Sequence, residues 1–520
     1  MALIQAVGQG MPVEEFFAQV QGFEVDAALK HMQLFVTVQE DGESARTGLV
    51  QVGDEPIHVV AAQGLSPMLD EFEADWKDWV GNGQLSPDLL AQVQGFDADA
   101  ALKHVRWLSS PELAGRQAGT PGDRAVADFL ADEFARAGLV PASDEGTYLQ
   151  NFPITYTRLL SVPVCAMLDA QGATMHTFSY PDDFRPMTQG AAGSGATEAQ
   201  VVWVRDGEYT DMHLGGRIVL RQRVPDPAAE AQLAMEHGAS GLIIATGWTS
   251  DHLRTQPVAG ESVFTSTIPV FEMSKDAFDQ LLALSGHTLT ELSTSPPALL
   301  LDLRLHMAVE ASTVQTTTQN VLGAIPGTDP DAGVLVLGAH YDGLGRLPGG
   351  LLYPGANRNA SGVGVLLEVA RLWQRNGWQP RRTILFAAWS GGELDQAGAQ
   401  HYVAHPTYPL TDTLLVLELD TVGAGVGYYL DVHTERGKSP TLSYVFNNGA
   451  EQLKRRVSME AYQDDGGHAP FHDNDVLAAL LTWNDARHLR TPQDTVEEID
   501  LPKLATTGEM VSLALYLLAR

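Results

Sequence analysis

The sequence predicts an α/β protein in which residues 313–520 form a doubly wound, mostly parallel sheet, with a β-rich insert and a small N-terminal α+β module. Continuous, mainly apolar runs are typical of strands covered by helices on both faces. Such runs occupy residues 334–340 (VLVLGAH), 383–389 (TILFAAW) and 414–420 (LLVLELD). Between the first two, residues 361–377 have helical spacing and end at Gly377, as expected of a crossover helix.

Residues 156–312 are predicted to be a separate β-rich unit. Its strands and helices are expected at 215–224, 228–239, 240–247 and 266–284, which alternate between apolar runs and helical spacing. This unit contains Cys165, the chain's single cysteine, in an apolar run that reads as a buried strand. One cysteine excludes intrachain disulfides, cysteine-ligated zinc and iron–sulfur clusters.

Residues 1–90 are predicted to form a small α+β module, and they contain one half of an internal repeat. Residues 18–31 (AQVQGFEVDAALKH) recur at 91–104 (AQVQGFDADAALKH) with twelve of fourteen positions identical. Asp26 and Asp99 are the expected N-caps of the two repeated helices. The intervening sequence alternates like strands in FVTVQ and TGLVQVGDEPIHVVAAQ and is then followed by an acidic helix, MLDEFEADWKDWV. A local duplication explains the extra module.

The charge composition limits which molecules this protein is expected to bind. The 65 acidic and 32 basic residues give a net charge of -33, which repels nucleic acid and anionic membrane surfaces. No window is apolar enough to span a membrane, and no secretory signal is visible at the amino terminus. We therefore expect a cytoplasmic protein, or a secreted one if a leader is missing. Nothing in the sequence specifies an oligomeric state.

Polar side chains stand where each of the three apolar runs ends. His340 ends the first run and Asp342 follows it, Glu393 follows the second, and Asp420 ends the third. In such sheets ligands bind beyond the carboxyl ends of the strands. One imidazole and several carboxylates suit zinc, with Asp342 orienting the His340 ring. The alternative is that these side chains merely face solvent.

The order of segments resembles the co-catalytic zinc aminopeptidase family, which includes bacterial leucyl aminopeptidases, glutamate carboxypeptidase, glutaminyl cyclase and the transferrin receptor ectodomain. The matching stretches are HVRWLSSPELAGRQAGTPGDRAVADFLADEFARAGLVP, TTTQNVLGAIPGTDP, GAHYDGLG, PGANRNASGVGVLLEVAR, WSGGELDQAGAQHYV, LELDTVG, DGGHAPF and RTPQDT. The resemblance implies that 91–155 and 313–520 form the aminopeptidase-like domain. It implies that 156–312 is an inserted protease-associated domain.

The resemblance also implies which residues would hold metal. The family binds two zinc ions through a histidine, a bridging aspartate, a glutamate, a second aspartate and a late histidine, beside a general-base glutamate. His340, Glu393 and Asp420 match the first histidine, the glutamate ligand and the second aspartate.

Three family positions are changed in this chain. Arg358 stands at the bridging aspartate, in GANRNASG, and Arg490 stands at the late histidine, in LRTPQDT. Gly392 stands at the general base. Arginine has no lone pair for a metal, and at ~4 Å its repulsion of a divalent ion would be ~8 kcal/mol at an effective dielectric near 20. We therefore predict that Arg358 and Arg490 replace the zinc pair by pairing with the nearby carboxylates, including Asp342, which leaves peptidase activity absent or much weakened.

Other interpretations remain open at this point. His468 or His472 could complete a mononuclear metal site, which would leave an active metallo-aminopeptidase. Ser390 follows a strand but lacks the elbow motif of a serine hydrolase. A third interpretation keeps the cleft for binding a peptide or protein. The aromatic residues that could line such a cleft, or pack in the core, are Trp389, Tyr402, Tyr428 and Tyr429.

Overall fold

The computed structural model describes residues 85–520 apart from 144–145, 188–192, 206–208, 210–213, 251–252, 254–265, 436–439 and 485, together with three short strands nearer the amino terminus. The chain divides into two units, Met1–Asp75 and Trp76–Arg520. In the first unit, β1 (Met32–Gln33), β2 (Thr47–Val52) and β3 (Glu55–Val60) form an antiparallel sheet. The strand prediction for residues 47–63 is thus confirmed by β2 and β3. Three other predicted segments lie outside the described residues: the first repeat copy (18–31), the strand FVTVQ (35–39) and the acidic helix (68–80).

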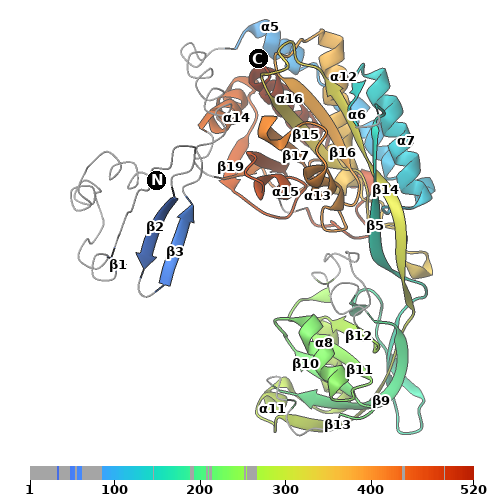
Figure 1. The fold of residues 1–520 in the computed structure, drawn as a ribbon. Helices are drawn as coiled ribbons and strands as arrows, with labels where there is room; N and C mark the ends of the chain where they lie inside the picture. The colour runs from blue at the N-terminus through green and yellow to red at the C-terminus, as the bar shows by residue number, and fades with distance from the viewer. Residues whose placement is uncertain are drawn as a thin grey trace. The chain divides into compact units, whose positions relative to one another are not determined.

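The second unit contains a nine-stranded mixed sheet in the order β19-β18-β20-β17-β15-β16-β14-β4, with β5 paired to β14. Four central strands, β20, β17, β15 and β16, run parallel. This confirms the doubly wound, mostly parallel prediction, and the three apolar runs are β15, β16 and β17 (Figure 1). The strand bounds are β4 Val140–Pro141, β5 Leu149–Leu159, β14 Ala311–Ile325, β15 Val334–His340, β16 Thr383–Trp389, β17 Thr413–Leu419, β18 Leu430–Thr434, β19 Val457–Ala461 and β20 Ala478–Thr482.

Helices cover both faces of this sheet. On one side α12 packs against α6, α7 and α16, and on the other α13 and α15 contribute Ala399, Tyr402 and Phe471 to a core beneath β14 to β17 (Figure 1). The crossover helix α12 is buried along most of its length and ends at Gly377, as predicted. The helix bounds are α5 Pro87–Val93, α6 Ala98–Leu108, α7 Pro121–Arg136, α12 Ser361–Asn376, α13 Ala397–Ala404, α14 Pro440–Leu453, α15 Ala469–His472 and α16 Leu501–Leu518.

The second repeat copy forms the end of α5, the turn after it and most of α6. Its helix is capped by Asp97, whose carboxylate accepts the backbone N–H of Ala100 at 2.9 Å. The expected cap, Asp99, is therefore wrong: it is the second residue of the helix, where its carboxylate still interacts favourably with the positive end of the helix dipole.

The insert has its own eight-stranded sheet, in the order β7-β6-β13-β9-β10-β11-β12-β8. The strands and helices expected from residue 215 onward are confirmed as β10, α8, β11, β12 and α10. Cys165 is fully buried in β6, and burial raises the pKa of its thiol. The element bounds are β6 Val164–Leu168, β7 Thr174–Thr177, β8 Phe184–Pro186, β9 Gly195–Val204, β10 Ile218–Gln222, α8 Pro227–Glu236, β11 Gly241–Ala245, β12 Val270–Met273, α10 Lys275–Ser285, α11 Leu289–Ser293 and β13 Ala298–Val309.

Among the described residues, no helix combines the length and the apolar character needed to cross a membrane.

Candidate functional site

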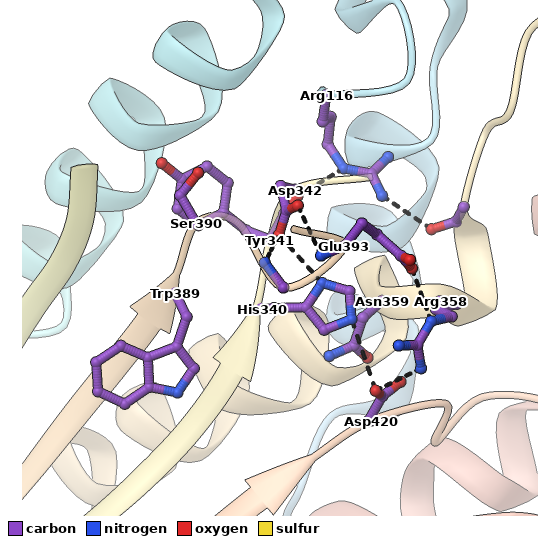
Figure 2. A network of polar contacts seen from close by, with 12 residues as sticks. Arg116, His340, Tyr341, Asp342, Arg358, Asn359, Trp389, Ser390, Glu393 and Asp420 are labelled. Atoms are coloured by element: carbon purple, nitrogen blue, oxygen red, sulfur yellow. Dashed lines mark hydrogen bonds and ion pairs between the residues drawn. The ribbon is translucent and has the colours of Figure 1, made fainter. Parts of the chain in front are cut away.

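Three neighbouring strand ends form the candidate site. β15 pairs in parallel with β16 on one side and β17 on the other, so their carboxyl ends share one edge of the sheet. This brings together His340, Glu393 and Asp420, each less than 6 % exposed (Figure 2). These residues are far apart in the sequence, and the parallel pairing of their strands brings them side by side.

Arg358 lies between the two carboxylates. Its guanidinium donates through Nε to Glu393 Oε1 at 2.7 Å and through Nη1 to Asp420 Oδ2 at 2.5 Å (Figure 2). The residue sits in a tight turn, Ala356–Ala360, directly before α12, and its own backbone is extended (φ -112°, ψ 98°) rather than helical. Asp494 holds this turn by accepting the backbone N–H groups of Asn357 at 2.7 Å and Arg358 at 3.0 Å. The backbone is therefore fixed where the side chain reaches both acids.

Arg490 and Thr421 take the remaining carboxylate oxygens. Arg490 donates through Nε to Glu393 Oε2 at 3.0 Å, and Thr421 donates to Asp420 Oδ1 at 2.7 Å. Burial raises the pKa of Glu393, but Arg490 and Arg358 outweigh it and lower the pKa to about 2. Asp420 follows the same pattern, since Arg358 and His340 overcome burial and lower its pKa. Both acids are held as carboxylates.

His340 and Asp342 form a second pair. His340 Nδ1 lies 3.3 Å from Asp342 Oδ1, and its Nε2 lies 3.6 Å from Asp420 Oδ2. Burial lowers the pKa of His340, but hydrogen bonding to Asp342 and Asp420 outweighs it and raises the pKa to about 10. Asp342 also accepts the backbone N–H groups of Gly392 at 2.7 Å and Glu393 at 3.1 Å. Among the described residues, Arg358 and Arg490 pair with Glu393 and Asp420 only, so the predicted pairing of either arginine with Asp342 is wrong: this carboxylate is taken by His340 and the turn after β16.

Arg116 is a buried site residue that the sequence analysis did not single out. It is fully buried and donates to the backbone carbonyls of Leu108, Tyr341, Pro354 and Gly355 at 2.5–3.0 Å (Figure 2). These bonds tie the segment after β15 to the loop that carries Arg358. Ala114, Gly115 and Arg116 all have positive φ (49°, 74° and 55°), and Gly115 is the residue among them whose type marks an unusual turn in the sequence.

The general-base position has no room for a side chain. A Cβ placed on Gly392 would lie 2.4 Å from Cγ and 2.5 Å from Cβ of His340. The His340 ring cannot retreat freely, since it is buried and bonded to Asp342. Glycine is required here by packing.

Gly392→Ala is expected to lower the free energy of unfolding by about 1–3 kcal/mol, because the added methyl overpacks a buried site. Urea unfolding followed by circular dichroism measures this. Gly215→Ala is the matched control, since a Cβ there meets nothing within 4 Å and its φ is not positive. Equal stability losses in the two variants would contradict the packing argument.

The other candidate side chains have their own partners and do not pair with Glu393 or Asp420. His468 Nε2 is 2.8 Å from the Gln463 carbonyl oxygen, and His472 Nε2 is 3.1 Å from Glu435. Ser390 is buried and donates to Asp123 at 2.9 Å. Trp389 and Tyr402 belong to the core, whereas Tyr428 and Tyr429 are 77 % and 50 % exposed.

This arrangement does not fit a zinc pair. A cation between Glu393 and Asp420 would need the space and the oxygens that Arg358 occupies. Across the described part of the chain, no three histidine, cysteine or acidic residues are grouped so that they could hold a metal ion.

A cavity of about 320 Å³ opens beside this cluster. Asn357 and Asp494, which anchor the Arg358 turn, form part of its wall. The remaining wall is made by the loops after β17 and before Arg490: Ala424, Gly425, Val426, Ala486, Arg487, His488 and Leu489, with Glu498 and Asp500.

Comparison with known proteins identifies relatives of this fold. Residues 320–515 match the sequence profile of peptidase family M28. Aminopeptidase YwaD of Bacillus subtilis is 29 % identical over 300 residues, which cover 55 % of this chain and 59 % of YwaD. Transferrin receptor protein 2 of Mus musculus is 34 % identical over 160 residues, which cover 29 % of this chain and 19 % of the receptor. The chain thus spans less than two thirds of either relative.

Solved structures show the same fold over more of the chain. The aminopeptidase from Aneurinibacillus sp. strain AM-1 superposes with a TM-score of 0.62 at 20 % identity, covering 83 % of this chain and 96 % of that one. The zinc aminopeptidase BSAP from Bacillus subtilis superposes with a TM-score of 0.59 at 22 % identity, covering 81 % and 95 %.

Proposed function

Residues 320–515 match peptidase family M28, and from that premise we propose that this chain is a zinc-aminopeptidase homologue that has lost two-zinc hydrolysis and keeps its cleft for binding a peptide or protein. The observation that carries the proposal is Arg358, whose guanidinium lies between Glu393 and Asp420. The family places a metal-bridging carboxylate at this position.

The buried carboxylates of the cluster are partnered by the chain's own side chains. Arg358 pairs with Glu393 and Asp420, Arg490 pairs with Glu393, and His340 lies within 3.6 Å of both Asp342 and Asp420. A divalent ion added here would meet the positive charge of Arg358, and this repulsion at ~4 Å is worth ~8 kcal/mol at an effective dielectric near 20. Gly392 also leaves no group to take a proton from water.

The adjoining cavity supports a binding role. It lies next to the cluster, and one wall is the loop that carries Val426, Tyr428 and Tyr429, all at least half exposed. Exposed aromatic side chains provide contact area at low entropic cost, which is typical of surfaces that bind peptides.

Metal content and hydrolysis test the loss of chemistry. After dialysis against micromolar zinc, we expect less than about a tenth of an equivalent of zinc per chain. An intact catalytic site would hold at least about one equivalent. Aminoacyl p-nitroanilides should show no chelator-sensitive hydrolysis, with BSAP as the positive control. About two equivalents with saturable hydrolysis would overturn the proposal. About one equivalent would indicate a mononuclear site instead, built with His468 or His472.

Retention of pooled random hexapeptides on ultrafiltration, read by mass spectrometry, tests the binding role. Tyr428→Ala should reduce retention, since this exposed residue follows two positions after Val426, which lines the cavity. A chain that retains no peptide would contradict the binding half of the proposal while leaving the zinc result untouched.

A further inference from the structure

Arg490 is the arginine of the cluster whose two outer nitrogens are unused. Its Nε donates to Glu393 Oε2 at 3.0 Å, and its side chain forms no other hydrogen bond or ion pair with a described residue. The side chain is 25 % exposed and leaves Nη1 and Nη2 within reach of solvent. Arg358 differs, since its side chain is 9 % exposed and its Nε and Nη1 are both bound to carboxylates.

The chain on both sides of Arg490 forms part of the wall of the adjoining cavity. Residues 486–489 and Asp494 line it, so Arg490 lies between two stretches of that wall. Its φ of 54° is in the left-handed region, which residues other than glycine seldom adopt. Such strained positions persist where the surrounding structure holds them, and they are concentrated at sites that clamp a ligand. The backbone and the bond to Glu393 together fix a guanidinium whose chain neighbours line the cavity.

The chemistry of the open nitrogens selects a hydrogen-bond acceptor. A guanidinium has N–H donors and no acceptor, so its partner must be a carbonyl or a carboxylate oxygen. A carboxylate is disfavoured, because Arg490 is already paired with Glu393 and the net charge of the chain is -33. The cavity wall also holds three acids against Arg487 and His488: Asp494, Glu498 and Asp500. A neutral carbonyl oxygen meets none of these obstacles.

Given the binding function proposed for the cleft, we propose that Arg490 determines which ligands it accepts, by holding a backbone carbonyl oxygen of the bound peptide with Nη1 and Nη2. The two nitrogens belong to one rigid planar group, so little freedom is lost when they bind. The ligand class is a peptide recognised through its backbone, with no requirement for acidic residues or for a free carboxyl end.

Retention on ultrafiltration, read by mass spectrometry, tests this contact with two pools of N-acetylated random hexapeptides that lack Asp and Glu. One pool ends in a free carboxylate and the other in an amide, so the second contains no carboxylate at all. We expect the full chain to retain the two pools within about 2-fold of each other. Retention of the free-acid pool alone would show that the cleft binds a carboxylate, and it would overturn the proposal.

Arg490→Lys should lower retention of the amide pool by at least about 10-fold, the effect expected when a hydrogen bond from a charged donor is lost. Lysine keeps a positive charge for Glu393 but replaces the planar group by a single ammonium. Arg490→Met, which removes the charge and the donors together, should lower retention at least as much. Arg456→Lys is the matched control, because Arg456 is exposed and lies outside the cavity wall. It should alter retention by less than about 2-fold.

The outcomes separate this contact from peptide binding itself. Undiminished retention by both Arg490 variants would overturn the role of Arg490 and leave the binding function in place. If the unaltered chain retained neither pool, the binding function would fail and the role of Arg490 with it. Thermal unfolding distinguishes a ligand contact from a structural role: Arg490→Lys should bind weakly while unfolding at the native temperature. Weak binding only in variants that unfold at a lower temperature would assign Arg490 a structural role and overturn the proposal.

Discussion

Replacing Arg358 with methionine is expected to lower the free energy of unfolding by about 3–5 kcal/mol, the usual cost of removing one partner from a buried ion pair. Methionine fills a similar volume but supplies no charge. Asp420 would lose its guanidinium donor, and Glu393 would keep only Arg490. Both carboxylates are nearly buried, so water cannot replace the lost partner.

Urea unfolding at neutral pH, followed by circular dichroism, measures this loss. Arg490→Met is the control, because Arg490 is 25 % exposed and contacts Glu393 alone among these acids. It should cost about 1–2 kcal/mol, in the range of one charge-assisted hydrogen bond. A loss below about 1 kcal/mol for Arg358→Met would mean that the buried pair does not stabilise the cluster as its geometry indicates.

Arg358→Asp combined with Arg490→His should convert the cluster into one that takes up zinc. The double variant removes two guanidinium groups and adds an anion and an imidazole, beside His340, Glu393 and Asp420. We expect zinc to rise from below about a tenth to at least about one equivalent per chain, measured by mass spectrometry of metals. Without zinc, the added anion should leave this variant less stable than the native chain.

Zinc should therefore stabilise the double variant and leave the native chain unchanged. A metal at 100 times its Kd adds about 2.7 kcal/mol of stability, which is readily seen as a shift in thermal unfolding. Hydrolysis should stay low even with zinc bound, since Gly392 supplies no base and loss of a base costs about 10²–10⁴-fold in rate. A folded double variant that takes up no zinc would show that the remaining ligands are misplaced for metal.

The sequence alone predicted the fold class and the strands and crossover helix that surround the candidate site. The apolar runs predicted β15, β16 and β17, and the helical spacing that ends at Gly377 predicted α12. These signals are local, because burial on both faces of a strand, or on one side of a helix, determines the pattern of apolar residues over a few neighbouring positions. The Asp97 cap was missed, since two aspartates two positions apart both satisfy the capping preference, and only backbone geometry distinguishes them.

The sequence by itself determined which residues stand at the three strand ends, and it predicted that arginines occupy two positions that hold metal in the family it resembles. Only the tertiary structure decided what those arginines touch. Arg358 meets Glu393 and Asp420, which are 35 and 62 positions away, because parallel pairing of β15 with β16 and β17 brings their ends to one edge. Asp494 is likewise distant in the sequence: it lies 136 positions from Arg358, yet it accepts the Arg358 backbone N–H and so fixes the turn. Contacts between residues so distant follow from strand order and loop anchoring, which no local pattern specifies.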